Sequence, residues 1–204
     1  MKNLFLFIFL LLGASAYAQN NTYMPQVFFD KQQAQDMLAI GTSTIEGVAY
    51  TRQYTDSKKQ NAPEGTLVTL YPLTPYFEEF LKLRTQKESK TNKVYLSEEA
   101  FKYRIEVKTD SYGRFKFEKL KPGKYYIESI VPYIGVGHYS EQTGTTTTYN
   151  GYGTAIASAP YYERFSYNFD AASRETKIVE IKNDGEFLDI KLYKSKISFK
   201  NLLK

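Results

Sequence analysis

The sequence contains no cysteine and no tryptophan, and its 204 residues include a single histidine, His138. Without thiols the chain can form no disulfide framework, no thiolate metal site and no cysteine nucleophile. One imidazole cannot supply the two or three histidines of a typical catalytic zinc site. The missing tryptophan also weakens the case for a carbohydrate-binding platform, in which large flat rings are used. We therefore expect a protein that is not an enzyme and that needs no cofactor or metal.

The charges are mixed in sign, with 27 Lys and Arg residues against 22 Asp and Glu residues. Basic and acidic residues are interspersed along the chain, as on the solvated face of a β-sheet. No block of like charges of the kind found in nucleic-acid-binding arms is present. We expect no nucleic acid among the partners of this protein.

The first 18 residues have the pattern of a secretory signal peptide. Lys2 is followed by an apolar run over 4–12, and Ala16-Tyr17-Ala18 places small residues where signal peptidase cleaves. The run is too short to span a bilayer as a stable helix, and a short N-terminal membrane anchor is the alternative interpretation. We expect cleavage after Ala18 and no transmembrane segment in the mature chain. An exported chain without cysteine suits a bacterium, in the periplasm or associated with the outer membrane or cell surface.

Most of the mature chain has the pattern of short β-strands. Period-two alternation and β-branched residues predict seven strands, at 43–50, 66–71, 101–109, 114–117, 124–131, 177–182 and 187–193. In the third, Phe101, Tyr103, Ile105 and Val107 alternate with charged residues, which predicts one buried face. Asn183-Asp184-Gly185 between the last two strands is a strong hairpin signal. Seven short strands without a long helix predict an all-β sandwich.

The rest of the mature chain lies outside these seven strands. Apolar spacing predicts a short helical segment over 31–40 and another around 76–84, whereas 19–30 reads as irregular or as an edge segment. Two long insertions, 72–100 and 132–176, separate the predicted strands. The apolar alternation within 197–203 predicts one more edge strand.

The segment 109–127, TDSYGRFKFEKLKPGKYYI, closely resembles a pattern of the carboxypeptidase regulatory-like domain. Residues 45–48 and 62–70 are similar to the first two strands of that family, and 176–194 to its last hairpin. The resemblance implies a seven-stranded, transthyretin-like (Ig-like) β-sandwich. Members of the family accompany zinc carboxypeptidases, extend outer-membrane nutrient transporters and recur in adhesins, and the pattern itself supplies no catalytic residue. Fold is therefore better predicted than function.

The resemblance divides the chain into four parts. Residues 1–18 are the expected signal peptide, 19–41 an N-terminal extension, 42–194 the sandwich with its insertions 72–100 and 132–176, and 195–204 a C-terminal tail.

His138 and Glu141 form an H-x-x-E pair, the spacing at which zinc carboxypeptidases place two ligands. A third ligand would have to be another histidine, and the sequence has none. A Ser-His-Asp triad would also have to use His138, and no G-x-S-x-G elbow is present. We interpret His138 as a surface or loop residue.

The insertion 132–176 is rich in tyrosine, glycine and threonine. Tyrosine offers a large flat contact surface and a hydroxyl at low entropic cost, which suits binding of a protein or a glycan. A long loop that folds over one sheet and buries its tyrosines is the alternative. The candidate contact residues are Tyr133, His138, Tyr139, Tyr149, Tyr152, Tyr161 and Tyr162.

The sequence thus leaves two functional hypotheses. The first is a non-catalytic exported module that binds a protein or another component of the cell envelope. The second is a carbohydrate-binding or small-ligand-binding accessory protein of an outer-membrane uptake system.

Overall fold

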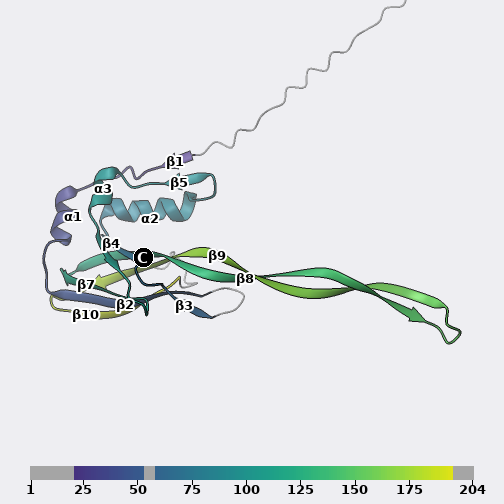
Figure 1. Ribbon diagram of the computed structural model, residues 1–204. Helices are drawn as coiled ribbons and strands as arrows, with labels where there is room; N and C mark the ends of the chain where they lie inside the picture. The colour runs from purple at the N-terminus through teal and green to yellow at the C-terminus, as the bar shows by residue number, and fades with distance from the viewer. Residues whose placement is uncertain (1–20, 53–57, 195–204) are drawn as a thin grey trace, which may run out of the picture.

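The structure is a computed structural model that describes residues 21–52 and 58–194. The expected signal peptide and the edge strand expected within 197–203 lie outside these residues. The described chain is an all-β sandwich with a helical layer on one side and a long two-stranded arm (Figure 1). The all-β class expected from the sequence is confirmed.

The first sheet of the sandwich is built around β2, Ser43–Arg52. Along one edge β2 pairs in parallel with β10, Phe187–Leu192. Along its other edge it pairs antiparallel with β7, Arg114–Leu120, and then with the short β3, Lys59–Asn61.

The second sheet has the order β6-β4-β8-β9, with every neighbouring pair antiparallel. Its strands are β6, Ile105–Lys108, β4, Leu67–Pro72, β8, Gly123–Tyr149, and β9, Ala155–Ile181. β8 and β9 are each 27 residues long, far longer than a typical strand of about five or six residues.

The main core lies between these two sheets, and both contribute to it. Phe115, Phe117 and Tyr125, which the family pattern places inward, are all in this core. Their partners are aliphatic side chains on alternate positions of the strands: Ile45, Val68, Leu70, Ile127, Val131, Val179, Ile181, Ile190 and Leu192. Burial raises the pKa of the Tyr125 hydroxyl to about 12.

The helical layer covers the outer face of β4 and β8 (Figure 1). Its main element is α2, Pro75–Lys87, which begins where the Thr74 side chain accepts a hydrogen bond from the Phe77 amide. Phe77 stacks on Tyr71 of β4 with ring centroids 4.7 Å apart, and Tyr126 of β8 lies 5.4 Å from Phe77. The helix predicted around 76–84 is therefore present, and it gives β8 a second buried face.

The remaining elements are short. α1, Lys31–Met37, corresponds to the helical segment expected over 31–40. β1, Asn21–Tyr23, pairs in parallel with β5, Asn92–Val94, at the margin of the helical layer. α3, Glu98–Lys102, connects β5 to β6.

The strand predicted over 101–109 is only half right. Its second half is β6, where Ile105 and Val107 pack against the core, but Phe101 lies in α3 and is 47% exposed. The helix forms because the Ser97 side chain accepts a hydrogen bond from the Ala100 amide, which caps the first turn. The alternation of apolar and charged residues continued by coincidence across this boundary.

The hairpin predicted at Asn183-Asp184-Gly185 is wrong. The segment does turn, and Gly185 has a φ of +75°. However, β9 belongs to the second sheet, whereas β10 pairs in parallel with β2 of the first. The turn therefore carries the chain from the second sheet to the first, where Ile190 and Leu192 of β10 face the main core.

Candidate functional site

The most prominent feature of the molecule is the part of the β8–β9 hairpin that extends beyond the sandwich, residues 132–172, here called the arm (Figure 1). Pairing of β8 with β4 ends at Ser129, and from there β8 and β9 pair mainly with each other. The arm ends in a turn in which the Asn150 side chain accepts hydrogen bonds from the amides of Tyr152 and Thr154. The tyrosine-rich insertion is therefore a strand pair, and its tyrosines are not folded over a sheet.

The two faces of the arm differ in chemistry. Side chains alternate between the faces of a strand, and the β8–β9 register is regular up to Gln142. Odd-numbered positions therefore continue the face that carries Tyr125 and Val131 into the core. On the arm these positions hold Tyr133, Tyr139, Phe165, Tyr167 and Phe169, here called the aromatic face. The face of β8 and β9 that is buried in the sandwich therefore continues along the arm as a face rich in aromatic residues.

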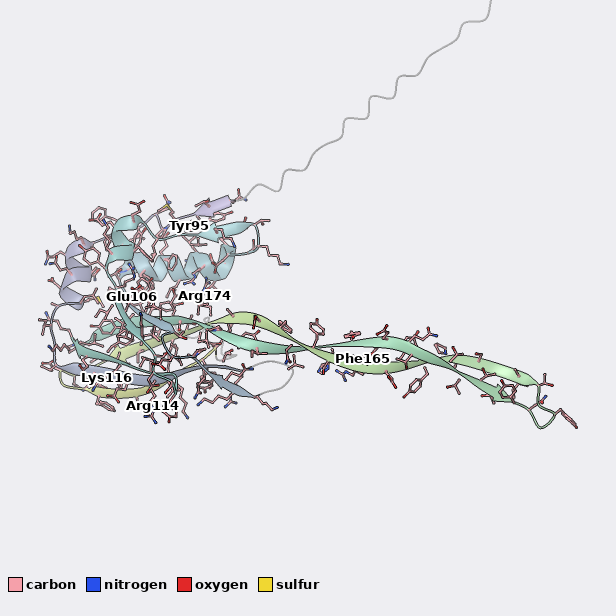
Figure 2. All side chains as sticks on the ribbon, in the orientation of Figure 1. Tyr95, Glu106, Arg114, Lys116, Phe165 and Arg174 are labelled. Atoms are coloured by element: carbon pink, nitrogen blue, oxygen red, sulfur yellow. The ribbon has the colours of Figure 1, made fainter. Side chains whose placement is uncertain are left out.

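The rings of the aromatic face form a continuous row. Tyr139 stacks on Phe165 across the two strands with ring centroids 5.5 Å apart, and its ring lies 6.2 Å from Tyr167. Tyr167 lies 6.0 Å from Phe169. Figure 2 shows Phe165 on the arm, well away from the sandwich. Tyr139 and Tyr167 are 49% and 52% exposed, so that each ring rests on a neighbour and keeps about half of its surface available for contact.

Two glycines make room for this row. Gly135 lies opposite Phe169 and Gly137 opposite Tyr167 in the register. A Cβ atom on Gly135 would lie 2.4 Å from the Phe169 ring, and one on Gly137 would lie 2.5 Å from the Tyr167 ring. The aromatic side chains therefore lie flat across the neighbouring strand, a pairing of glycine with an aromatic residue that stabilises exposed strands.

The other candidate residues are distributed over the rest of the arm. His138 and Tyr162 lie at even positions, on the face opposite the aromatic face, and Tyr161 lies at an odd position. Tyr149 lies next to the terminal turn, and Tyr152 within it is 96% exposed. Of the candidate residues, all within the described part of the chain, the structure therefore brings only Tyr139 into ring contact with the row. Tyr133 and Tyr161 lie on the same face without such a contact, and the others lie on the opposite face or at the terminal turn.

The aromatic face includes Phe165, Tyr167 and Phe169, which were not among the candidate contact residues. Their signal in the sequence was period-two spacing, because Phe165, Tyr167 and Phe169 alternate on one strand. The glycines and Tyr139 alternate in the same way on the other strand.

One contact joins the arm itself to the sandwich, and two more hold β9 just beyond the base of the arm, at Arg174 and Glu175. The side-chain amide of Gln60 on β3 donates a hydrogen bond to the Ile134 carbonyl at 2.9 Å and accepts one from the Ile134 amide at 3.0 Å. On the helical side, Arg174 of β9 pairs with Glu88 at 2.9 Å, where the arm joins the body (Figure 2). On the inner face, the carboxylate of the buried Glu175 accepts a hydrogen bond from the Lys194 amide.

The helical attachment continues into the body as a network of charges. Arg84 of α2 pairs with Glu128 of β8 at 3.0 Å and with Glu88 at 3.4 Å. The Tyr126 hydroxyl donates to the Glu128 carboxylate, and burial, with that carboxylate, raises the pKa of Tyr126. Burial acts against the charged form of Arg84, but Tyr126 and Glu128 outweigh it and raise the pKa of the guanidinium.

The arm carries few charges. Glu141, Glu163, Arg164 and Asp170 are its only charged residues, and 142–162 contain none. The arm is therefore suited to contact through rings, small side chains and backbone rather than through ion pairs.

The geometry does not favour a metal site at His138 and Glu141. The two residues lie an odd number of positions apart on a regular strand, so their side chains point to opposite faces of the arm. Among the residues that the structure describes, no group of three or more His, Cys, Asp or Glu side chains is placed to hold a metal ion.

Comparison with known proteins supports the fold. No protein-family model matches the chain, and no curated protein does. A crystal structure of a "putative carbohydrate binding protein" from Pseudomonas aeruginosa is similar with a TM-score of 0.53, at 20% identity, over 82% of this chain and 99% of that chain. The minor pilin GBS52 of Streptococcus agalactiae matches at a TM-score of 0.32 and 13% identity, over 77% of this chain and 98% of that one, which is too distant to carry an argument.

The described chain is thus a β-sandwich protein with a projecting aromatic arm, and its fold is shared with a solved bacterial structure. None of its described helices has the length and apolar character needed to cross a membrane.

Proposed function

We propose that this protein is a non-catalytic, exported binding module that contacts a protein of the bacterial cell envelope through the aromatic face of its arm. One observation carries the proposal: a row of half-exposed rings lies on a segment, 132–172, that supplies no residue to either hydrophobic core. A structural role in the sandwich therefore does not account for these rings.

The chemistry of the row suits a protein partner. Aromatic residues are enriched where protein interfaces bury their central residues, because each ring removes a large apolar area from water at a small cost in side-chain entropy. The rings of Tyr139 and Tyr167 are already positioned by their neighbours and would lose little freedom on binding.

Location and domain organisation are part of the same proposal. The signal-peptide pattern of residues 1–18 supports export, with cleavage after Ala18 and a place in the periplasm or at the outer membrane or cell surface. The segment 109–127 supports a domain of the carboxypeptidase regulatory-like type over 42–194. The residues 19–41 then form an N-terminal extension and 195–204 a tail.

Carbohydrate binding by the same face is the second candidate. Sugar rings stack on flat aromatic surfaces, and the stacking of Tyr139 on Phe165 provides such a surface. The similar structure from Pseudomonas aeruginosa bears a name that includes carbohydrate binding, which supports this candidate at the level of analogy only.

Site-specific photocrosslinking tests the proposal. A photoreactive phenylalanine analogue would replace Tyr139 on the arm or, as a matched control, the exposed Tyr112 in the turn that precedes β7. Each mature chain would be irradiated with isolated envelope membranes. We expect a discrete protein adduct from position 139 and none from position 112.

Loss of the rings should also weaken binding. The Tyr139→Ala/Tyr167→Ala protein should co-sediment with envelope membranes at least about tenfold less than the parent, as when central interface residues are removed. The Tyr139→Phe/Tyr167→Phe protein keeps the rings and should bind like the parent. Undiminished binding by the alanine protein would refute a role for this face. Binding to purified envelope polysaccharide without a protein adduct would favour the carbohydrate candidate instead.

A further inference from the structure

Among residues 21–52 and 58–194, no strand pairs with the outer edge of β9 on the arm. Both backbone groups of Ile134 bond to Gln60, so they point away from β9. Asp170 lies directly opposite Ile134, and directly opposed residues of an antiparallel pair have their backbone groups oriented alike. The amide and carbonyl of Asp170 therefore point away from β8. By alternation, so do those of Asn168, Ser166 and Arg164.

Such an edge is normally protected by charge, by proline or by cover, because it can pair with any other strand. Pro160 protects the distal end, since it lacks an N–H group at an outward-pointing position. Between Pro160 and the body, two of the outward-pointing positions carry exposed side chains of opposite charge: Arg164 is basic and Asp170 is acidic. Neither forms an ion pair with a residue that the structure describes.

These residues complement a second copy of the same edge. Two β9 strands that pair antiparallel about a twofold axis at Tyr167 place Arg164 opposite the partner's Asp170, and Asp170 opposite the partner's Arg164. Ser166 then faces the partner's Asn168. On the other face Phe165 meets the partner's Phe169, and Tyr167 meets the partner's Tyr167. Every outward backbone group from Arg164 to Asp170 finds a partner in this one register.

We propose that the protein forms a twofold dimer in which the β9 edges of two arms pair antiparallel, centred on Tyr167. The product is a four-stranded sheet with the order β8-β9-β9-β8. Two properties of the sequence support this register over a shifted one. A shift by two residues would oppose Arg164 to the partner's Asn168 or the partner's Ala172, and a shift by one would mix outward and inward backbone groups.

The dimer would double the candidate binding surface. A twofold axis perpendicular to the sheet puts both aromatic faces on the same side, where the two rows of rings become one surface. This consequence rests on the proposed function, but the dimer itself does not.

Charge reversal tests the register on purified mature protein by sedimentation equilibrium over a concentration series. Arg164→Asp places an acidic residue opposite the partner's Asp170 at both ends of the paired segment. Asp170→Arg likewise places a basic residue opposite the partner's Arg164 at both ends. Each single change should raise the dissociation constant of the dimer at least about tenfold. The double change Arg164→Asp/Asp170→Arg exchanges the two charges and should restore the parental constant. Equal dissociation constants for all four proteins would overturn the proposed register.

Disulfide formation gives an independent readout, because the chain has no other cysteine. A cysteine at position 167 would face its own copy across a non-hydrogen-bonded pair about 4.5 Å wide, which is within disulfide reach. Tyr167→Cys should therefore form a covalent dimer under mild oxidation. Tyr161→Cys, on the same face and similarly exposed, would face the partner's Ser173 and should form no covalent dimer.

The two proposals fail separately. A parent chain that sediments as a monomer at every concentration, or a Tyr161→Cys protein that crosslinks as readily as the Tyr167→Cys protein, overturns the dimer. Capture of an envelope partner at Tyr139 could still be intact in that case, because crosslinking to membranes does not require two arms to pair.

Discussion

Gly47 shows how a single residue can decide the fit between the strands of the first sheet. It lies in the middle of β2, flanked by β10 on one side and β7 on the other. A Cβ atom at this position would lie 2.5 Å from the Ile190 carbonyl oxygen and 2.8 Å from the Phe115 ring. The Ile190 oxygen belongs to the backbone of a paired strand and cannot move aside cheaply.

Replacement of Gly47 by alanine should therefore destabilise the sandwich. We expect Gly47→Ala to lower the free energy of unfolding by about 1–3 kcal/mol, the usual cost of overpacking a well-filled core. Urea denaturation followed by circular dichroism measures the change. Gly151→Ala in the terminal turn of the arm is the matched control, since a Cβ there meets no atom within 4 Å. Equal stability of the two proteins would show that β10 does not pack as closely on β2 as described.

Residue patterns predicted the core better than they predicted its boundaries. Phe115, Phe117 and Tyr125 were expected inside and are buried, because each follows a turn that fixes which way the strand faces. Phe101 was expected inside and is exposed, because capping by Ser97 begins a helix where the alternation of side chains suggested a strand. Local hydrogen bonding by one short polar side chain outweighed the apolar periodicity.

At the scale of the elements, Gln60 of β3 connects the arm to the first sheet through two hydrogen bonds to Ile134. Its amide group reproduces the donor and acceptor of a strand residue, and it satisfies both backbone groups of Ile134 at the point where β4 has ended. The hydrogen bonds are exposed to solvent, so they hold the orientation of the arm more than they stabilise the fold.

Replacement of Gln60 should change hydrogen exchange at Ile134 and leave exchange in the sandwich unchanged. In Gln60→Ala we expect the Ile134 amide to exchange its hydrogen about five- to tenfold faster, because it loses its only protein acceptor among the described residues. Amides of Tyr126 and Ile127 in the sandwich should exchange as before. Hydrogen exchange by mass spectrometry or NMR measures both. Gln142→Ala, farther out on the arm, controls for loss of a surface amide. Unchanged exchange at Ile134 would contradict the joint.

The pairing of elements was the least predictable part of the fold. The strand at 187–193 was correctly expected, but its partner was not, because Asn183-Asp184-Gly185 has hairpin chemistry. A turn of this type reverses the chain without specifying whether it stays in one sheet. Which sheet β10 joins depends on the apolar area that it buries against β2 and β9. Both strands are far from β10 in sequence or in a different sheet, so no local pattern of residues specifies the choice.

At the scale of the whole molecule, both hydrophobic cores are built without the arm. Neither hydrophobic core contains a residue from 132–172, although these residues make up much of β8 and β9. An isolated two-stranded ribbon is at best marginally stable in water. The arm therefore depends on the sandwich at its base, while the sandwich does not depend on the arm.

Excision of the arm tests whether the sandwich folds without it. Tyr133 and Ala171 are directly opposed and hydrogen-bonded across β8 and β9, so an Asn-Gly turn can replace residues 134–170 between them. We expect the shortened chain to keep its free energy of unfolding within about 1 kcal/mol of the parent, as measured in urea. Phe77→Ala in the parent serves as a positive control and should lose about 3–5 kcal/mol. Failure of the shortened chain to fold would show that the arm supports the sandwich.

The sequence by itself determined the class of fold, three of the buried aromatic residues, Phe115, Phe117 and Tyr125, and the segment to which we assign the function. These depend on local properties, namely the period of apolar residues, turn chemistry and composition, which act between residues close together in the chain. Only the tertiary structure decided that the tyrosine-rich insertion is a pair of extended strands and that β10 crosses to the other sheet. The tertiary structure alone also decided that rings from both strands form one row. The reason is that register and sheet assignment depend on contacts between residues far apart in sequence. Because the chain has no cysteine, packing, hydrogen bonds and ion pairs hold those contacts without disulfides.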